Sequence, residues 1–284
     1  MWTFRSNWSS TALLLVATAI LAHTQQLAVE DAVITDFEGG IGVPLTYQFS
    51  SGQKAHLAFR IRGFSRGETE QKISLNYTID VFDCDGVLIA PPHSGAVERR
   101  SGSVSRSWIP TVRYVVDIPA VPRAGTHMFR IRVRDNVAAI ETLTGIEFEV
   151  QSAYDEPAES FELRRFRFYG SERDEKPVAE PVFRAGDSMW GRFLLTGFRT
   201  EAGNRYDLRY GVSLRNAAGR TLFSEPNAAS ETRESFYPKS HVSGAIKLAL
   251  ERAIRPGQYA LVISALDALG KQLINAEFPF RVVE

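Results

Sequence analysis

Cysteine and net charge are what this sequence most clearly lacks. Cys84 is the single cysteine among 284 residues, so no disulfide can form within the chain, and cores and sheet ladders must supply the stability. Lys plus Arg and Asp plus Glu number 33 each, which leaves no net field to attract nucleic acid or an anionic membrane. We therefore expect no nucleic-acid partner.

Motifs for catalysis and cofactor binding are also missing. The sequence has no glycine-rich phosphate loop and no His-Glu-x-x-His pattern. Ser188 follows Gly186 but lacks the Gly-x-Ser-x-Gly frame of a nucleophile elbow. His127 begins a predicted strand, and His56, His93 and His241 are expected at exposed strand positions or in loops. The sequence thus predicts a protein with no catalytic residues, no cofactor and no metal.

One long hydrophobic run is present, at 11–22, after a short segment that carries Arg5. It spans about 12 residues, fewer than the ~20 that cross a bilayer, and small residues follow it. This layout is typical of a secretory signal peptide, 1–24, cleaved after Thr24. We expect an exported protein, periplasmic or extracellular, with no transmembrane segment after cleavage.

The rest of the chain is an internal duplication. Gly63-Phe64 returns as Gly197-Phe198, 134 positions later (63 to 197), and the match continues to Asp135 and Asp267, 132 positions apart. A period this long indicates two copies of one domain. The boundaries predicted from it are a first domain at 25–150, a linker at 151–160 and a second domain at 161–284.

Each copy reads as short strands with alternating apolar and polar residues, such as 57–62 and 73–81. The segment 243–254 has the composition of a helix, but its counterpart at 114–119 reads as a strand, so we predict a strand there as well. Six or seven strands per copy favour an all-β fold of two tandem immunoglobulin-like antiparallel β-sandwich domains.

The stretch Pro256-Gly257-Gln258-Tyr259-Ala260-Leu261 resembles the Gly-x-Tyr-x-Leu strand of bacterial immunoglobulin-like and fibronectin-III-like modules. The first copy departs from the pattern, because His127 stands where the tyrosine would be. The resemblance covers one strand per copy. It implies a sandwich fold and an adhesive or scaffolding use, and it transfers no site residues.

The stretch Asp83-Cys84-Asp85-Gly86 offers carboxylates at alternate positions, as a calcium site would. The second copy has Arg215 to Gly219 there, with the glycine but no carboxylate. We therefore predict a hairpin turn, with Cys84 as a small buried or turn-adjacent residue; pairing of Cys84 between chains is the alternative.

A row of guanidinium groups is predicted on one outer face, because Arg130, Arg132 and Arg134 alternate with apolar residues. Cross-strand pairs with Glu147 and Glu149 on the last strand would account for the row as a solvated ladder. An anion-binding stripe is the alternative.

Exposed aromatic residues are the remaining candidates for binding. Trp190 should point outward, either filling the joint between the two sandwiches or offering a platform to a ligand. The segments 90–108 and 224–241 read as polar loops on a rigid scaffold, where specificity often resides. Their aromatic residues are the candidate contacts, namely Trp108, Phe236 and Tyr237.

Together these features favour a non-catalytic binding or scaffold protein that presents loops and strand faces to a protein partner in the cell envelope or extracellular space. A pair of carbohydrate-binding modules, using the exposed aromatics on polysaccharide, is the alternative.

Overall fold

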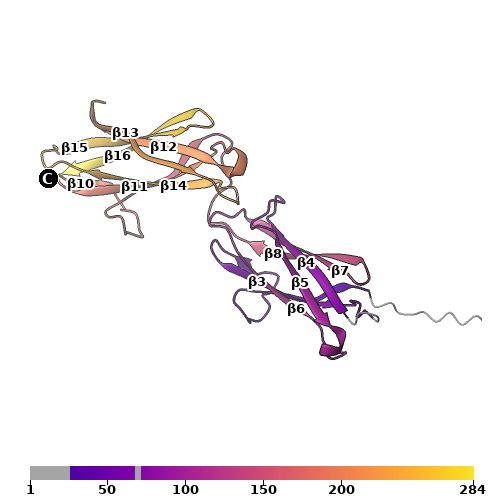
Figure 1. Cartoon of the computed structure of the whole chain (residues 1–284). Coiled ribbons are helices and arrows are strands. Elements are labelled where there is room, and N and C mark those ends of the chain that lie inside the picture. The colour runs from indigo at the N-terminus through magenta and orange to yellow at the C-terminus, as the bar shows by residue number, and fades with distance from the viewer. Residues whose placement is uncertain (1–25, 68–71) are drawn as a thin grey trace, which may run out of the picture.

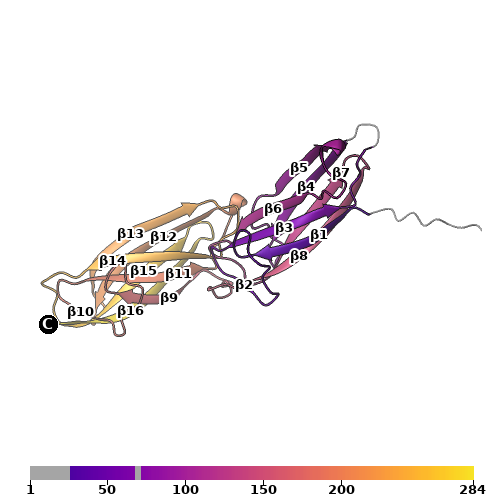
Figure 2. The same ribbon diagram turned by 90° about the horizontal axis from the view of Figure 1, so that it is seen from below.

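The computed structural model describes residues 26–67 and 72–284 and consists of two β-sandwiches that lie end to end (Figures 1 and 2). The expected signal peptide lies outside these residues. Helical structure in the described part amounts to two 3₁₀ turns, η1 (Ser101–Ser103) and η2 (Ala202–Asn204). None of the described helices is long and apolar enough to cross a membrane.

The first sandwich pairs a three-stranded sheet, ordered β1-β3-β6, with a five-stranded sheet, ordered β2-β8-β7-β4-β5. Its strands are β1 (Ala28–Thr35), β2 (Gln48–Phe49), β3 (Lys54–Arg62), β4 (Lys72–Phe82), β5 (His93–Arg100), β6 (Thr111–Asp117), β7 (Gly125–Asp135) and β8 (Ile140–Val150).

The second sandwich repeats this topology strand for strand, with sheets ordered β14-β11-β9 and β10-β16-β15-β12-β13. Its strands are β9 (Glu162–Tyr169), β10 (Val182–Arg184), β11 (Ser188–Thr196), β12 (Tyr206–Asn216), β13 (Thr221–Arg233), β14 (His241–Ala249), β15 (Gly257–Asp267) and β16 (Gln272–Val283). The predicted all-β fold with two duplicated sandwich domains is confirmed.

The prediction of purely antiparallel sheets is wrong in one detail. The short strands β2 and β10 pair in parallel with the ends of β8 and β16. Each follows a loop that carries the chain from the edge of the three-stranded sheet across to the other sheet, and therefore enters alongside the last strand.

Each sandwich has its own core, formed by the inward residues of both sheets. Of the segment of ambiguous composition, residues 243–249 belong to β14, as the repeat predicts, whereas 250–254 lie outside the strand. Ile246 and Leu248 are buried, and Lys247 between them is exposed. Burial alternates in this way when one face of a strand packs against the core and the other faces solvent.

The residues that carry the repeat are structural. Asp135 and Asp267 are fully buried, and each carboxylate accepts hydrogen bonds from three backbone N–H groups. One of the three donors follows the repeated Gly-Phe pair, at Ser65 or Arg199. Gly63 has a φ of 71°, and a side chain there would collide with the backbone of Gln26; Gly197 is constrained in the same way by Ser160.

Each of the two segments expected as loops contains an edge strand. Segment 90–108 contains β5, and segment 224–241 contains most of β13, each at the edge of a five-stranded sheet. The prediction failed because neither strand has a fully buried side chain, and no alternation of apolar residues marks them in the sequence.

The predicted hairpin turn at Asp83–Gly86 is confirmed, with the amide of Gly86 donating to the carbonyl of Asp83 at 3.1 Å. Gly86 and its counterpart Gly219 have φ values of 78° and 76°. Cys84 lies in this turn and is exposed, with Sγ 3.2 Å from the carbonyl oxygen of Ala124.

Candidate functional site

The contact between the two sandwiches centres on Tyr237, which follows β13. Its ring packs against the core of the first domain, and its hydroxyl donates to Oδ2 of Asp83 at 2.8 Å. The hydroxyl oxygen of Tyr237 also accepts a hydrogen bond from the backbone amide of Arg123 at 3.3 Å. Burial, and then the hydrogen bond to Asp83, raise the pKa of this hydroxyl, so it remains a donor at neutral pH. Tyr237, predicted as a contact to an outside partner, therefore lies at the joint.

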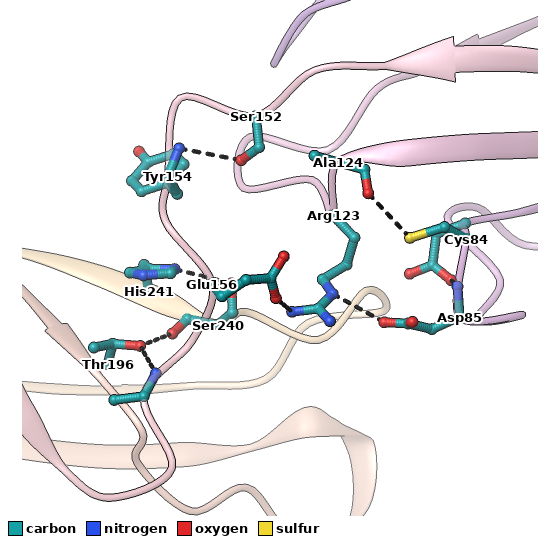
Figure 3. Close-up of polar contacts among 12 residues, drawn as sticks. Cys84, Asp85, Arg123, Ala124, Ser152, Tyr154, Glu156, Thr196, Ser240 and His241 are labelled. Carbon is teal, nitrogen blue, oxygen red and sulfur yellow. Dashed lines mark hydrogen bonds and ion pairs between the residues drawn. The ribbon is translucent and has the colours of Figure 1, made fainter.

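Arg123 extends this joint to the linker. Its guanidinium lies between Asp85 and Glu156, with ion pairs of 2.9 and 2.8 Å (Figure 3). The linker is in turn held by the second domain, because Arg165 pairs with Asp155 at 2.8 Å and Thr196 accepts the amide of Ala158 at 3.3 Å. The predicted linker is therefore bonded on both sides.

His241 is part of the same joint. It is buried, its ring lies 5.2 Å from that of Tyr154, and its Nδ1 is 3.0 Å from the hydroxyl of Ser240 (Figure 3). Burial, followed by the charges of Arg164 and Arg165, lowers its pKa. His127 is also buried. The expectation that His241 lies at an exposed position is wrong, because the linker covers it.

The arginine row forms on the outer face of β7, but its partners differ from those predicted. Arg130 pairs with Asp80 of β4 at 2.7 Å and lies over the Phe82 ring at 4.4 Å. Arg132 pairs with Glu141 at 3.4 Å. Glu147 and Glu149 lie opposite Met128 and Thr126, two and four residues before Arg130 in β7, and not opposite the arginines. Arg134 lies opposite Glu141 and Asn76.

Trp190 points outward from β11, as predicted, and is half-buried. Its strand neighbours are Tyr169 and Lys247, and the Lys247 ammonium lies 5.8 Å from the Trp190 ring. The interpretation that Trp190 fills the joint is wrong. Thr196, at the other end of β11, is the residue of this strand that bonds to the linker.

The other two aromatic candidates lie apart from one another. Trp108 is half-buried, with its ring edge-on to Phe64 at 6.1 Å, and its carbonyl accepts from Arg66. Phe236 is 50% exposed, beside Tyr237. The structure therefore does not gather the predicted residues into one site.

A groove that the sequence reasoning missed lies on the open side of the first sandwich, between β1 and β8. We call it the β1–β8 groove; its volume is about 490 Å³, and its walls include Ala32, Val43, Ile146 and Phe148. The loop 36–47 contributes further lining residues, from Gly42 to Leu45 and Tyr47. Two apolar side chains of this loop are almost wholly exposed, Ile41 at 91% and Leu45 at 93%.

The second sandwich closes the same position. Phe166 and Phe278, which correspond to Ala32 and Ile146, stack there with ring centroids 3.6 Å apart. Gly191 makes room for Phe166, whereas its counterpart in the first copy is Leu57. The corresponding loop, 170–181, is rich in charge and has Glu175 in place of Ile41. Aligning the two copies at an offset of 134 (41 to 175) was the signal that could have found the groove.

Among the described residues, no group of three or more His, Cys, Asp or Glu side chains is placed to hold a metal ion. Partial desolvation of the Cys84 thiol at the base of the turn, followed by the charges of Asp85 and Asp83, raises its pKa, which disfavours the reactive thiolate.

Comparison with known proteins gives no family. No family model matches the chain, and no curated protein is similar to it. Solved structures with some likeness include a family 123 glycoside hydrolase from Clostridium perfringens, 13% identical over 43% of this chain and 27% of that one, with a TM-score of 0.30. Others are the C-terminal domain of Wzt (8% identical, 45% of this chain and 76% of that one, TM-score 0.32) and red sea bream transglutaminase (8%, 92% and 31%, TM-score 0.26). The chain thus spans about a quarter of the glycoside hydrolase (27%), and likeness at this level gives no information on activity.

Proposed function

We propose that this protein is a non-catalytic, exported binding or scaffold protein that engages a protein partner in the cell envelope or extracellular space. Its two sandwiches would belong with the bacterial immunoglobulin-like and fibronectin-III-like modules that the Gly-x-Tyr-x-Leu strand resembles. The observation that carries the proposal is the apolar loop 36–47, in which Ile41 and Leu45 expose nearly all of their surface to solvent. Apolar side chains exposed together mark protein contacts more often than chance.

Because the domain is duplicated, loop 36–47 can be compared with the equivalent loop of the second copy. The loop 170–181 joins the equivalent strands and has the same length, yet it carries acidic and basic residues such as Glu172, Arg173 and Lys176. The fold itself therefore does not require an apolar loop at this place. The bonded joint supports a scaffold role, because it fixes how the two domains present their surfaces.

The proposal is tested by passing envelope and culture extracts over immobilised chain 25–284, before and after protease treatment of the extract. A partner that is captured, is lost after protease treatment and is no longer retained by the Ile41→Glu/Leu45→Glu variant supports the proposal. The matched control is the same pair of substitutions at Leu222 and Leu273, exposed apolar residues of the second sandwich. Capture of nothing from either extract contradicts it.

Polysaccharide binding is the second candidate, and it depends on the outward, half-exposed ring of Trp190. Aromatic rings on a sheet face stack on sugar rings, although Lys247 lies over this one. Retention on protease-resistant polysaccharide that falls with Trp190→Ala would favour this function.

A further inference from the structure

Building on the proposed function, we propose that the β1–β8 groove binds an extended polypeptide segment of the partner as an added strand along the free edge of β8. The segment would alternate apolar residues, which enter the groove, with polar residues that include a basic one facing Glu147.

The edge of β8 is open along most of its length. β8 runs from Ile140 to Val150, and β2 pairs with it only at Glu149 and Val150. No other described strand pairs with this edge. The chain leading into β2 turns aside to β1, where the amide of Val43 donates to the carbonyl of Ile34 at 2.9 Å. The remaining backbone groups of the edge are available to a further strand.

The groove offers apolar space beside that edge. Inward side chains of β8 alternate with outward ones, and Ile146 and Phe148 face the interior. In the second sandwich the stacked Phe166 and Phe278 occupy this place, so the fold accommodates large apolar side chains there. Alternate apolar side chains of an added strand would fill the first groove as that pair fills the second.

Charge selects the kind of segment. Glu147 lines the groove from the outer face of β8 and makes no ion pair with any residue that the structure describes. Asp36 and Glu38 lie in the adjacent loop. A basic residue on the added strand beside Glu147 would form a cross-strand pair. The same carboxylates repel an anionic bilayer, which disfavours membrane insertion of the apolar loop.

The test uses nine-residue synthetic peptides and the chain 25–284. One peptide alternates Val with Lys and Thr, a second has Glu in place of Lys, and a third has the composition of the first with its valines in one block. Binding is measured by fluorescence anisotropy, and hydrogen exchange locates the protected amides. We expect the alternating Lys peptide to bind at least tenfold more tightly than the other two and to protect amides within 140–148.

Two variants examine the site. Glu147→Lys, an exposed substitution that leaves the core intact, should reverse the preference between the Lys and Glu peptides. Ile146→Phe, which introduces the residue found at the equivalent position of the second copy, should weaken binding tenfold. Glu225→Lys on the exposed edge strand β13 is the matched control and should change nothing. Thermal melting confirms that each variant is folded.

Other results would overturn the inference. Protection of β13 instead of β8, or equal binding of all three peptides, would exclude strand addition at this groove. Concentration-dependent dimers that protect 140–148 and are abolished by Glu147→Lys would make a second copy of the chain the occupant. Binding to phosphatidylglycerol vesicles through Ile41 and Leu45 would make the loop a membrane contact. If a protein partner is captured while no peptide binds, the proposed function stands and this inference fails.

Discussion

The hydroxyl of Tyr237, in the second sandwich, donates to Oδ2 of Asp83 in the first at 2.8 Å. The other carboxylate oxygen of Asp83 accepts the amides of Asp85 and Val87 within its own turn. The counterpart of Asp83 is Asn216, whose Oδ1 makes the same two turn bonds, to Ala218 and Arg220. Both copies therefore have the same turn, and the carboxylate of Asp83 provides one additional acceptor, Oδ2, which binds the Tyr237 hydroxyl at the joint.

Tyr237→Phe should loosen the joint. The substitution removes the donor to Asp83 and the acceptor for the Arg123 amide while keeping the ring. A hydrogen bond to a charged group contributes about 1.5–3 kcal/mol, so a double-mutant cycle with Asp83→Asn should give a coupling energy in this range. Denaturant unfolding measures the energies, and X-ray scattering reports the spread of domain orientations.

Asp83→Asn is the matched partner in this cycle, because Asn216 shows that an asparagine can form the same turn. If the two substitutions have strictly additive effects, the hydrogen bond does not couple the domains.

Gly191→Leu should destabilise the second sandwich. A Cβ at Gly191 would lie 2.7 Å from Cε2 of Phe166, too close for any side chain without movement. The first copy has Leu57 and Ala32 at these positions, so Gly191→Leu combined with Phe166→Ala should recover part of the stability. Calorimetry of the single and double variants measures this recovery. A double variant less stable than the sum of the two singles would show that the copies do not pack alike.

Asp267→Ala should destabilise the second sandwich by about 3 kcal/mol or more, since it leaves three part-buried amides without their acceptor. These belong to Arg199, Leu269 and Gly270. Asp135→Ala should act equally on the first sandwich. Hydrogen exchange resolved by domain distinguishes the two, and an effect under 1 kcal/mol would show that water replaces the carboxylate.

Stability should fall as the pH drops below about 6.5, in part through His127. Burial lowers the pKa of this histidine, and its Nε2 has no hydrogen-bond partner within 26–67 and 72–284. The unfolded chain then takes up a proton near pH 6.5 while the folded chain does not, so unfolding is favoured down to the folded-state pKa. Above pH 7 both states are neutral and the contribution vanishes.

His127→Tyr, which introduces the residue of the second copy at this position, should reduce the slope of unfolding free energy against pH between 6.5 and 5. One proton accounts for at most about 1.4 kcal/mol per pH unit. His56→Gln on β3 is the control. Urea titrations across this range measure the slope, and an unchanged slope in the variant would show that His127 is protonated in the folded chain.

How much the sequence could predict depended on whether a feature was local. The alternation around Ile246 and the repeat together identified β14 despite its helical composition. The edge strands β5 and β13 were not predicted, because neither has a fully buried face that would leave an alternating pattern of apolar residues. The partners of Arg130 required the register of β7 against β4, which no spacing reveals.

The joint and the groove were harder to predict, because each brings together residues far apart in the sequence. Tyr237 reads as an exposed loop aromatic until the domains are placed against one another. The groove depends on Ala32 and Ile146, which lie on two strands far apart in the sequence. In the sequence, the contrast between Ile41 and Glu175 in the equivalent loops is its clearest sign.

The stack of Phe166 on Phe278 also bears on how such a chain can diversify. In a single isolated sandwich, an open groove in place of a stacked aromatic pair would lower the free energy of unfolding, and no neighbouring domain would compensate for the loss. In this chain the second copy has the stacked pair, and Tyr237 and Arg123 hold the end of the first sandwich through contacts at the joint. Substitutions should therefore accumulate most freely around Ala32, Ile146 and loop 36–47 when homologous chains are compared, whereas Phe166 and Phe278 should vary less.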